Sequence, residues 1–360
     1  MVTGNQGMVD VVVVGGGPAG SAAAIRLSQI GKRVRLYEKT RFPRAKLCGG
    51  YLSAEAIPEL DDLGVLDTVK AASWPTHRIL ASPPSGRWAE SRLTASAFSV
   101  SRARFDEILL TCAKDSGVDV IEGEDGYPHV DEGAWRVIAA GRSAVPGPKG
   151  GEAFYGVQAL FDHVSGVTDQ VELDGIPGGY VGLARQDGSV NVCALVSQST
   201  LRRGGSNLDE ALRVWITMNP LLRDRLSDAK RVSEWLAVGP VIMGLRRLSE
   251  GKTFYVGDAA CVVDPFAGEG MAMGLSTGHV LKNAFLESPD NPAPAYERLW
   301  HRQFDSSLRL QKIICWGIMH PWWQELLAKS CIVFPAFMRW LTDNTRANEH
   351  FKSHPDFRPL

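Results

Sequence analysis

The sequence has almost no net charge, no paired cysteine motif and no long hydrophobic run, and each of these shortages excludes a class of protein. Its 39 Lys and Arg residues against 40 Asp and Glu leave a formal net charge of −1, so there is no electrostatic reason to expect a nucleic acid partner. The six cysteines form no CxxC pair, and no histidine lies at metal-ligand spacing from one. We therefore expect neither a metal site nor a disulfide framework.

Hydrophobic stretches are short as well. The run Val11–Val14 ends in glycines, and no positively charged region precedes it. It predicts a buried parallel strand and not a signal peptide or a membrane span, so we expect a cytoplasmic protein. With 360 residues, 44% of them hydrophobic, the chain is long enough for one large globular domain or two intergrown ones.

The first third of the chain alternates strands and helices. Residues 9–14 and 33–38 are expected to be strands on either side of a helix over residues 18–30. Further helices are expected over residues 53–72 and 101–116, because their apolar residues recur at helical spacing. This order is typical of an α/β fold with a parallel sheet.

The middle third, residues 118–200, carries turn signals at short intervals. Asp187-Gly188 lies between two apolar stretches at residues 179–183 and 190–196, which is a good hairpin signal. We therefore expect a mostly antiparallel sheet in this part of the chain, forming a second layer that faces the substrate.

The C-terminal third is expected to be mainly helical. A buried strand over residues 254–257 precedes a helix over roughly 270–286, and later helices are interrupted by Pro321 and Pro335. We expect those later helices to be too short to span a bilayer and to pack on the main domain. Alternatively they cap an apolar pocket or contact a membrane surface, because tryptophan suits interfaces. Half of the ten tryptophans lie there: Trp300, Trp316, Trp322, Trp323 and Trp340.

The strongest local motif follows the first strand. Its glycines directly open a helix, where the first allows a tight turn, the second lets the backbone approach a pyrophosphate and the third lets helix and strand pack closely. The helix N-terminus offers free N–H groups to phosphates. The residues that we expect to bind a dinucleotide here are Gly15, Gly17, Pro18, Ala19 and Gly20.

An acidic residue closes the second strand. Glu38, with Lys39 beside it, lies eighteen residues beyond Gly20. A carboxylate at this point suits hydrogen bonds to a ribose diol and would repel a 2′-phosphate. The sequence therefore favours FAD or NAD over NADP.

A second motif separates FAD from NAD. Gly257-Asp258 follows a strand, and a Pro-x-x-Gly-x-Gly loop then opens another helix with Pro265, Gly268, Gly270 and Met271. This pair resembles the second flavin motif of the p-hydroxybenzoate hydroxylase and geranylgeranyl reductase superfamily. The resemblance implies that Asp258 contacts the ribityl–phosphate part of FAD and that the loop carries the pyrimidine edge of the flavin.

Two further segments resemble the geranylgeranyl reductase-like branch. Lys46-Leu47-Cys48-Gly49 is similar to its Lys-x-Cys-Gly segment, and residues 101–106 to its Arg-x-x-Phe-Asp helix start. The resemblance implies that Lys46, Cys48, Gly49 and Arg104 lie near the cofactor. It also implies that Cys48 faces the flavin near the substrate, where a thiol could donate or relay a proton.

Other positions depart from that branch. Gly182 stands where its aromatic segment has Trp, and Ala139 where an Asp-Gly motif has Asp. Tyr180, in the same aromatic segment, is our candidate for a pocket-lining catalytic residue. The Trp-x-Trp-x-Ile-Pro motif of halogenases is absent, which argues against halogenation.

The expected fold class is α/β, in three parts. A discontinuous Rossmann-type FAD-binding domain is intergrown with an antiparallel-sheet substrate domain, and a helical region follows. The expected ranges are 1–75, 101–145 and 246–290 for the FAD-binding domain, 76–100 and 146–245 for the substrate domain, and 291–360 for the helical region.

The expected activity is that of an FAD-dependent oxidoreductase. It would reduce a double bond, or carry out a related two-electron step, on an apolar small molecule such as an isoprenoid, lipid or secondary metabolite. The alternatives are an NAD(P)H-dependent flavin monooxygenase and a non-catalytic flavin-binding protein. Because the chain has one full dinucleotide fingerprint, either NAD(P)H reaches the flavin without a second Rossmann domain or a partner reductase delivers the electrons.

Overall fold

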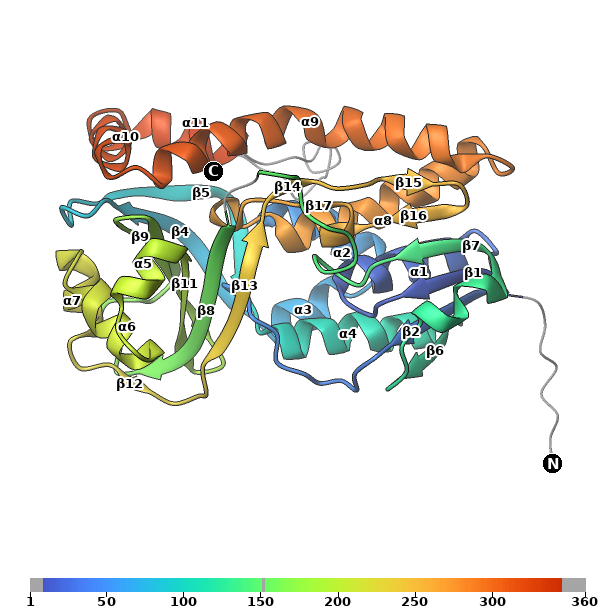
Figure 1. Cartoon of the computed structure of the whole chain (residues 1–360), viewed down its shortest axis with the longest axis horizontal. Helices are drawn as coiled ribbons and strands as arrows, with labels where there is room; N and C mark the ends of the chain where they lie inside the picture. The colour runs from blue at the N-terminus through green and yellow to red at the C-terminus, as the bar shows by residue number, and fades with distance from the viewer. Residues whose placement is uncertain (1–8, 151–152, 345–360) are drawn as a thin grey trace.

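The computed structural model describes residues 9–150 and 153–344, in which two β-sheets lie next to each other beneath a layer of C-terminal helices (Figure 1). The first sheet has six strands in the order β15-β16-β7-β1-β2-β6. All neighbours pair in parallel except β15 with β16. The strands are β1 (Val9–Val14), β2 (Val34–Glu38), β6 (Asp119–Glu122), β7 (Gly133–Ile138), β15 (Ser249–Glu250) and β16 (Thr253–Tyr255).

Helix α1 ties the first sheet to its covering helices. It packs on β1 and β2 and lies between α4 and α8. The four valines Val11–Val14 of β1 are buried, as expected for the central strand of a sheet covered on both faces. The helices of this part are α1 (Pro18–Gln29), α2 (Ile57–Asp62), α3 (Leu66–Ala71), α4 (Arg102–Asp115) and α8 (Gly270–Glu287), with the 3-10 turns η1 (Ala54–Ala56), η2 (Tyr127–Glu132), η3 (Gly257–Ala259) and η4 (Pro265–Ala267).

The second sheet has nine strands and is antiparallel except where β4 pairs with β9. Helix α6 covers it with the fully buried Trp215. Its strands are β3 (Tyr51–Leu52), β4 (Trp74–Ser82), β5 (Ala89–Ser99), β8 (Ala153–Asp162), β9 (Gln170–Ile176), β10 (Gly179–Gln186), β11 (Ser189–Ser197), β12 (Lys230–Arg231) and β13 (Leu236–Ile242). The neighbouring elements are α5 (Gln198–Arg203), α6 (Leu208–Ile216), α7 (Pro220–Leu226), β14 (Gly244–Leu245) and β17 (Cys261–Val262).

The predicted fold class is confirmed, and so is the hairpin. β10 and β11 pair across Asp187-Gly188, where both residues have positive φ angles of 50° and 83°. Residues 118–200 carry turn signals throughout, but they form antiparallel pairs only from β8 onward. β6 and β7 join the parallel sheet and lie within the range 101–145 expected for the FAD-binding domain. One local prediction is wrong. The helix expected over residues 53–72 is broken at Gly64, whose φ of +71° ends α2.

The C-terminal helices α9 (Pro292–Ile318), α10 (Pro321–Val333) and α11 (Pro335–Asn344) run across the top of the view in Figure 1. The expectation that they are too short to span a bilayer is wrong for α9, whose 27 residues extend about 40 Å. Charged side chains along α9 make it too polar to cross a membrane. No described helix combines the length and the apolar character that a membrane span needs.

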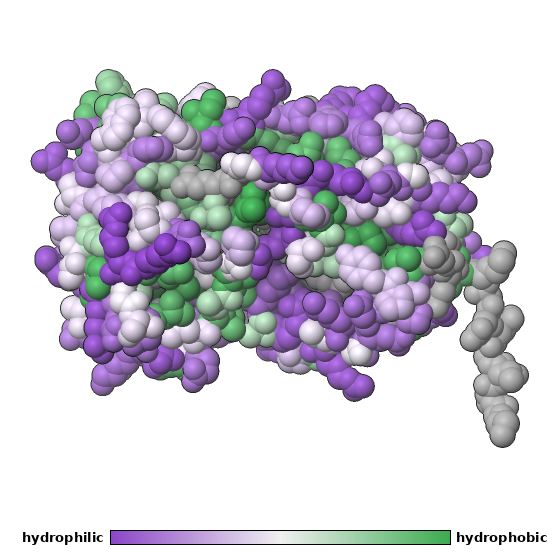
Figure 2. All heavy atoms as spheres, in the orientation of Figure 1, coloured by the Kyte–Doolittle hydropathy of each residue, from purple (hydrophilic) through white to green (hydrophobic). Residues whose placement is uncertain are grey.

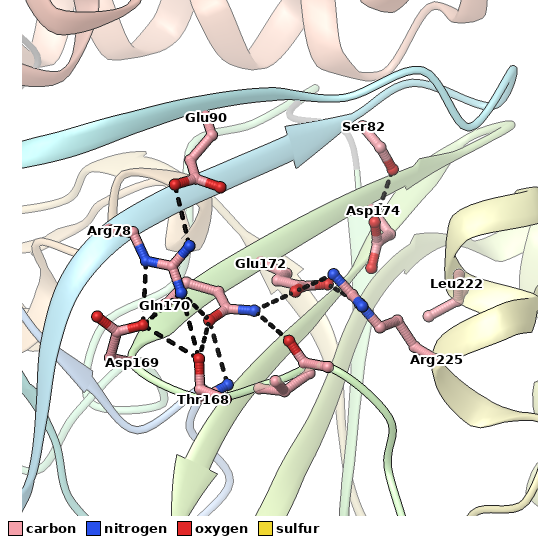
Figure 3. A network of polar contacts seen from close by, with 12 residues as sticks. Arg78, Ser82, Glu90, Thr168, Asp169, Gln170, Glu172, Asp174, Leu222 and Arg225 are labelled. Atoms are coloured by element: carbon pink, nitrogen blue, oxygen red, sulfur yellow. Dashed lines mark hydrogen bonds and ion pairs between the residues drawn. The ribbon is translucent and has the colours of Figure 1, made fainter.

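A buried polar network joins β4, β9 and α7 on the second sheet (Figure 3). Glu172 accepts hydrogen bonds from Arg225 Nε at 3.0 Å and from Gln170 Nε2 at 2.7 Å. Asp174 accepts one from Ser82 Oγ at 2.6 Å, while its Oδ2 has no partner among the described residues. Burial, followed by the neighbouring Glu172 carboxylate, raises the pKa of Asp174 to about 7.

Asp174 should make the protein less stable at higher pH. Its folded pKa of about 7 exceeds the ordinary 3.8, so the folded state holds a proton that the unfolded chain has lost. Stability therefore falls as the pH rises from about 4 to about 7 and stays lower above that. We expect Asp174→Asn to remove roughly 3 kcal/mol of this loss between about pH 5 and about pH 8, because about two pKa units of the shift lie in that window, at about 1.4 kcal/mol per unit. Urea unfolding at about pH 5 and about pH 8 measures it, and an equal loss in both proteins would contradict the prediction.

Candidate flavin-binding site

A cavity of about 700 Å³ lies between the two sheets, where the surface is hollowed near the centre of Figure 2. It opens at the carboxyl ends of β1, β2 and β7, which is where open α/β sheets bind their ligands. Segments far apart in the chain line it: the glycine turn after β1, residues 37–51, Arg102, residues 125–127, residues 139–144 and residues 256–274. Strands β10, β11 and β13 of the second sheet close the far wall. Its volume falls in the range of cofactor sites.

The glycine turn leaves its backbone open to the cavity. Gly15 has a φ of +105°, and a Cβ there would lie 2.6 Å from the carbonyl oxygen of Ala139. A Cβ on Gly20 would lie 1.8 Å from the carbonyl oxygen of Gly15, so Gly20 packs α1 on the turn and does not line the cavity. A Cβ on Gly17 would meet only Arg102 Nη2, at 3.8 Å. A phosphate could therefore approach the N-terminus of α1 at Gly17.

Glu38 is held in place at the end of β2. Its Oε2 accepts a hydrogen bond from the Gly16 N–H at 2.8 Å, and its Oε1 accepts one from the Thr40 hydroxyl at 2.6 Å. Arg44 lies 3.8 Å from the same carboxylate. Glu38 and Lys39 both line the cavity, so the carboxylate is fixed beside the glycine turn where a ribose diol would lie.

The second motif packs directly against the first. Gly257 has a φ of +57°, and a Cβ there would lie 2.7 Å from the Ala19 Cβ. Gly268 has a φ of +68°, and a Cβ there would lie 2.5 Å from the Tyr51 ring. Close packing thus brings the N-termini of α1 and α8 to one cavity. The second-motif residues that line it are Gly257, Asp258, Pro265, Gly268, Gly270 and Met271.

The segment around Cys48 is anchored to the second sheet. The Cys48 N–H donates to Gln158 Oε1 at 2.8 Å, and its carbonyl accepts from Asn191 Nδ2 at 2.9 Å. The Gly50 N–H donates to Cys48 Sγ at 3.4 Å. With Lys46 and Gly49, the half-buried Cys48 thus forms part of the cavity wall.

Lys46 is a partly buried cation in the cavity wall. Burial, followed by the charge of Arg102, lowers its pKa. A negatively charged group in the cavity would offset both effects. Together with the open Gly17 and the fixed Glu38, this arrangement fits FAD.

Two protonated groups line the wall near Cys48. Burial, with smaller contributions from nearby acidic groups, raises the pKa values of Tyr180 and Cys193. Both therefore stay neutral at ordinary pH. The Cys48 thiol lies close enough to Tyr180, Cys193 and Arg102 to act on their pKa values.

The arginine expected at the cofactor lies elsewhere. Arg104 is exposed on α4 and outside the cavity lining, whereas Arg102 lines the cavity and forms an ion pair with Asp106 at 2.6 Å. Side chains that are two positions apart on a helix point in nearly opposite directions. The Arg-x-x-Phe-Asp spacing counted back from Phe105 itself designates Arg102, a signal that our assignment of Arg104 overlooked.

Replacing each arginine in turn tests whether only Arg102 contributes to FAD binding. We expect Arg102→Lys, which keeps a charge beside Asp106, to weaken FAD binding about tenfold by losing the planar fork of donors. Arg104→Ala should change it by less than about twofold, because an exposed side chain outside the cavity makes no contact there. Fluorescence titration of each apoprotein with FAD measures the difference. Equal effects in the two variants would show that Arg102 plays no special part.

A second cavity, of about 120 Å³, lies behind the far wall. Aliphatic side chains from β4, β9, α9 and α10 surround it, among them Ile79, Leu173, Ile314 and Leu327. Tyr180 lines both cavities. The sequence motifs did not reveal this apolar cavity, because its walls come from segments far apart in the chain.

Comparisons with known proteins agree with this geometry. A family model described as an FAD binding domain matches residues 8–133. A menaquinone reductase of Mycobacterium tuberculosis is 30% identical over 335 residues, which are 81% of this chain and 78% of the relative. A digeranylgeranylglycerophospholipid reductase of Methanocaldococcus jannaschii is 26% identical over 85% of this chain and 86% of the relative.

Solved structures share the fold. A triple mutant of a flavin-dependent brominase superposes with a TM-score of 0.79 at 16% identity, covering 97% of this chain and 96% of that one. The myxobacterial chondrochloren halogenase gives 0.75 at 20% identity, covering 98% and 94%. At such identities the likeness concerns the fold alone. The family model, the relatives and the cavity between the two motifs together show that the chain belongs to the family of FAD-dependent oxidoreductases built on this FAD binding domain. It is therefore an enzyme.

Proposed function

We propose that the enzyme reduces a carbon–carbon double bond, or carries out a related two-electron reduction, on an apolar small molecule of the isoprenoid, lipid or secondary-metabolite type. The observation that carries the proposal is the apolar cavity, which shares Tyr180 with the flavin cavity. An apolar chain lying there would bring a double bond past Tyr180 toward Cys48, which lines the same flavin cavity. The relatives named menaquinone reductase and digeranylgeranylglycerophospholipid reductase support a reductase of the geranylgeranyl reductase-like branch.

In this reduction Cys48, Tyr180 and the walls of the apolar cavity have different roles. When bound, reduced FAD supplies the hydride. Cys48 donates the proton to the other carbon of the double bond, and the resulting thiolate is stabilised by the Gly50 N–H and by the nearby Arg102 charge. Tyr180, which stays protonated, separates the cavities and orients the substrate. The aliphatic walls exclude water. Solvent then returns a proton to Cys48.

Oxygen dependence tests the proposal against a flavin monooxygenase. The holoenzyme is reduced chemically under nitrogen and mixed with prenylated quinones and unsaturated isoprenoid lipids. The masses of the products are then measured by mass spectrometry. We expect a product that gains two hydrogens in the absence of oxygen. A reaction that requires oxygen and adds an oxygen atom would replace this proposal with hydroxylation.

The electron donor is part of the same proposal. NAD(P)H, or a partner reductase, would reduce the flavin, since the chain has one full dinucleotide fingerprint. Bleaching of the flavin absorbance by NADH or NADPH under nitrogen would assign the donor. If neither nucleotide bleaches it, a partner reductase supplies the electrons.

A further inference from the structure

The outer face of the C-terminal helices is unusually apolar. Of the fourteen large hydrophobic side chains that are exposed in the described residues, seven lie on α9, α10 and α11, and an eighth, Phe334, lies between α10 and α11. Val333 and Phe334 are 65% and 66% exposed, and Trp322 is 60% exposed. We call this set the C-terminal apolar face: Ile313, Trp316, Trp322, Leu326, Ile332, Val333, Phe334 and Trp340. Clustered exposed apolar side chains mark an interaction surface.

The charges around the C-terminal apolar face have one sign. Between residues 309 and 341 the exposed charged side chains are cations, namely Arg309, Lys312, Lys329 and Arg339. Glu325 is the only acidic residue of that stretch. It is partly buried and accepts hydrogen bonds from the N–H and the hydroxyl of Ser85 at 2.9 Å each. The chain as a whole has a net charge of −1, so positive charge is concentrated here.

We infer that the C-terminal apolar face docks on an anionic lipid bilayer, with the helices lying in the interface. Tryptophan, phenylalanine and leucine flanked by lysine and arginine are typical of interfacial helices, and each cation near an anionic surface adds to the attraction. Lysine is depleted at protein–protein interfaces, which favours lipid over a second copy of the chain. In Figure 2 hydrophobic atoms are visible at the upper left edge, where α10 lies in Figure 1.

The inner face of the same helices lines the apolar cavity. Ile314 and Ile318 of α9, Leu327 and Cys331 of α10, and Met338 of α11 contribute to its wall. Docking would therefore place the cavity against the acyl region, so that an apolar substrate could pass from the bilayer toward Tyr180. This consequence for substrate entry rests on the proposed function, whereas the docking itself does not.

Vesicle flotation of the holoenzyme tests the docking without any substrate. We expect the protein to float with phosphatidylcholine vesicles that contain phosphatidylglycerol and less with phosphatidylcholine alone. Lys329→Glu should weaken binding at least about fivefold, the equivalent of about 1 kcal/mol per charge. The double variant Trp322→Asp with Phe334→Asp should weaken it more than about tenfold, because both side chains are exposed on this face. Flavin content shows that each variant is folded.

A matched control lies on another helix. Leu286, on α8, is 58% exposed, and Leu286→Asp should leave vesicle binding unchanged. The inference is overturned if the wild type does not float with anionic vesicles, or if the control releases the protein as fully as the double variant. It is also overturned if light scattering shows a dimer that the double variant dissociates while vesicle binding is absent. A failed turnover assay would count against the proposed function alone.

Discussion

Replacing Gly17 with aspartate is expected to abolish FAD binding while leaving the protein folded. Gly17 is the N-cap residue of α1, with an extended backbone (φ −70°, ψ −178°) that any residue can adopt. A Cβ there meets only Arg102, at 3.8 Å. Aspartate is a favourable N-cap, so α1 should be at least as stable as with glycine.

The added carboxylate would occupy the place of a phosphate. Its oxygen would accept hydrogen bonds from the same free N–H groups of α1 that a pyrophosphate would use. It would also repel the two phosphate charges, at about 1 to 4 kcal/mol for each pair of charges at about 4 Å. We therefore expect Gly17→Asp to weaken FAD binding at least about a hundredfold.

Asparagine at the same position separates charge from shape. Gly17→Asn has the same size and caps α1 equally well but carries no charge, so it should lose about tenfold or less. Titration of the apoproteins with FAD measures affinity, and thermal unfolding of the apoproteins checks the fold. Should the two variants bind FAD equally well, the phosphates do not lie at Gly17.

Replacing Cys48 with alanine is expected to slow turnover about a hundredfold with FAD still bound. General acid catalysis typically contributes at least that factor. The segment is held by the Cys48 backbone, through Gln158 and Asn191, so losing the thiol leaves these anchors intact. Flavin content and the rate of flavin reduction by the electron donor should be unchanged, because the step that is lost is protonation of the substrate.

Cys193 provides the matched control. It lines the same cavity, and burial, followed by the nearby Cys48, raises its pKa. Cys193→Ala should keep turnover within about threefold, since a thiol that serves only in packing contributes little beyond its small volume. Single-turnover measurements under nitrogen separate flavin reduction from product formation. If Cys48→Ala turns over as fast as Cys193→Ala, the Cys48 thiol is not the proton donor.

Local motifs determined much of the cofactor site. The glycine turn after β1, Glu38 at the end of β2, and Gly257 with the loop before α8 are each set by backbone conformations within a few residues. Positive φ angles at Gly15, Gly257 and Gly268 explain why glycine is required at those points. The fold class followed from the same short patterns, because strand and helix periods are local properties of a sequence.

Tertiary structure decided which side of a motif faces the site. Arg102 and Arg104 belong to one helix start, and the packing of α4 directs Arg102 into the cavity and Arg104 to solvent. The placement of β6 and β7 beside β2 and β1 was likewise a matter of long-range pairing. Such outcomes depend on which distant elements meet, and sequence periodicity carries no information about that.

The sequence by itself determined that this protein is a flavin-type dinucleotide binder with an α/β fold, because phosphate turns depend on residues that are neighbours in the chain. The apolar cavity at Tyr180 and the exposed face on α9–α11 exist only in the folded molecule. The walls of the cavity come from strands and helices more than a hundred residues apart, brought together by burial of apolar surface. Tertiary packing thus decides where substrate meets flavin.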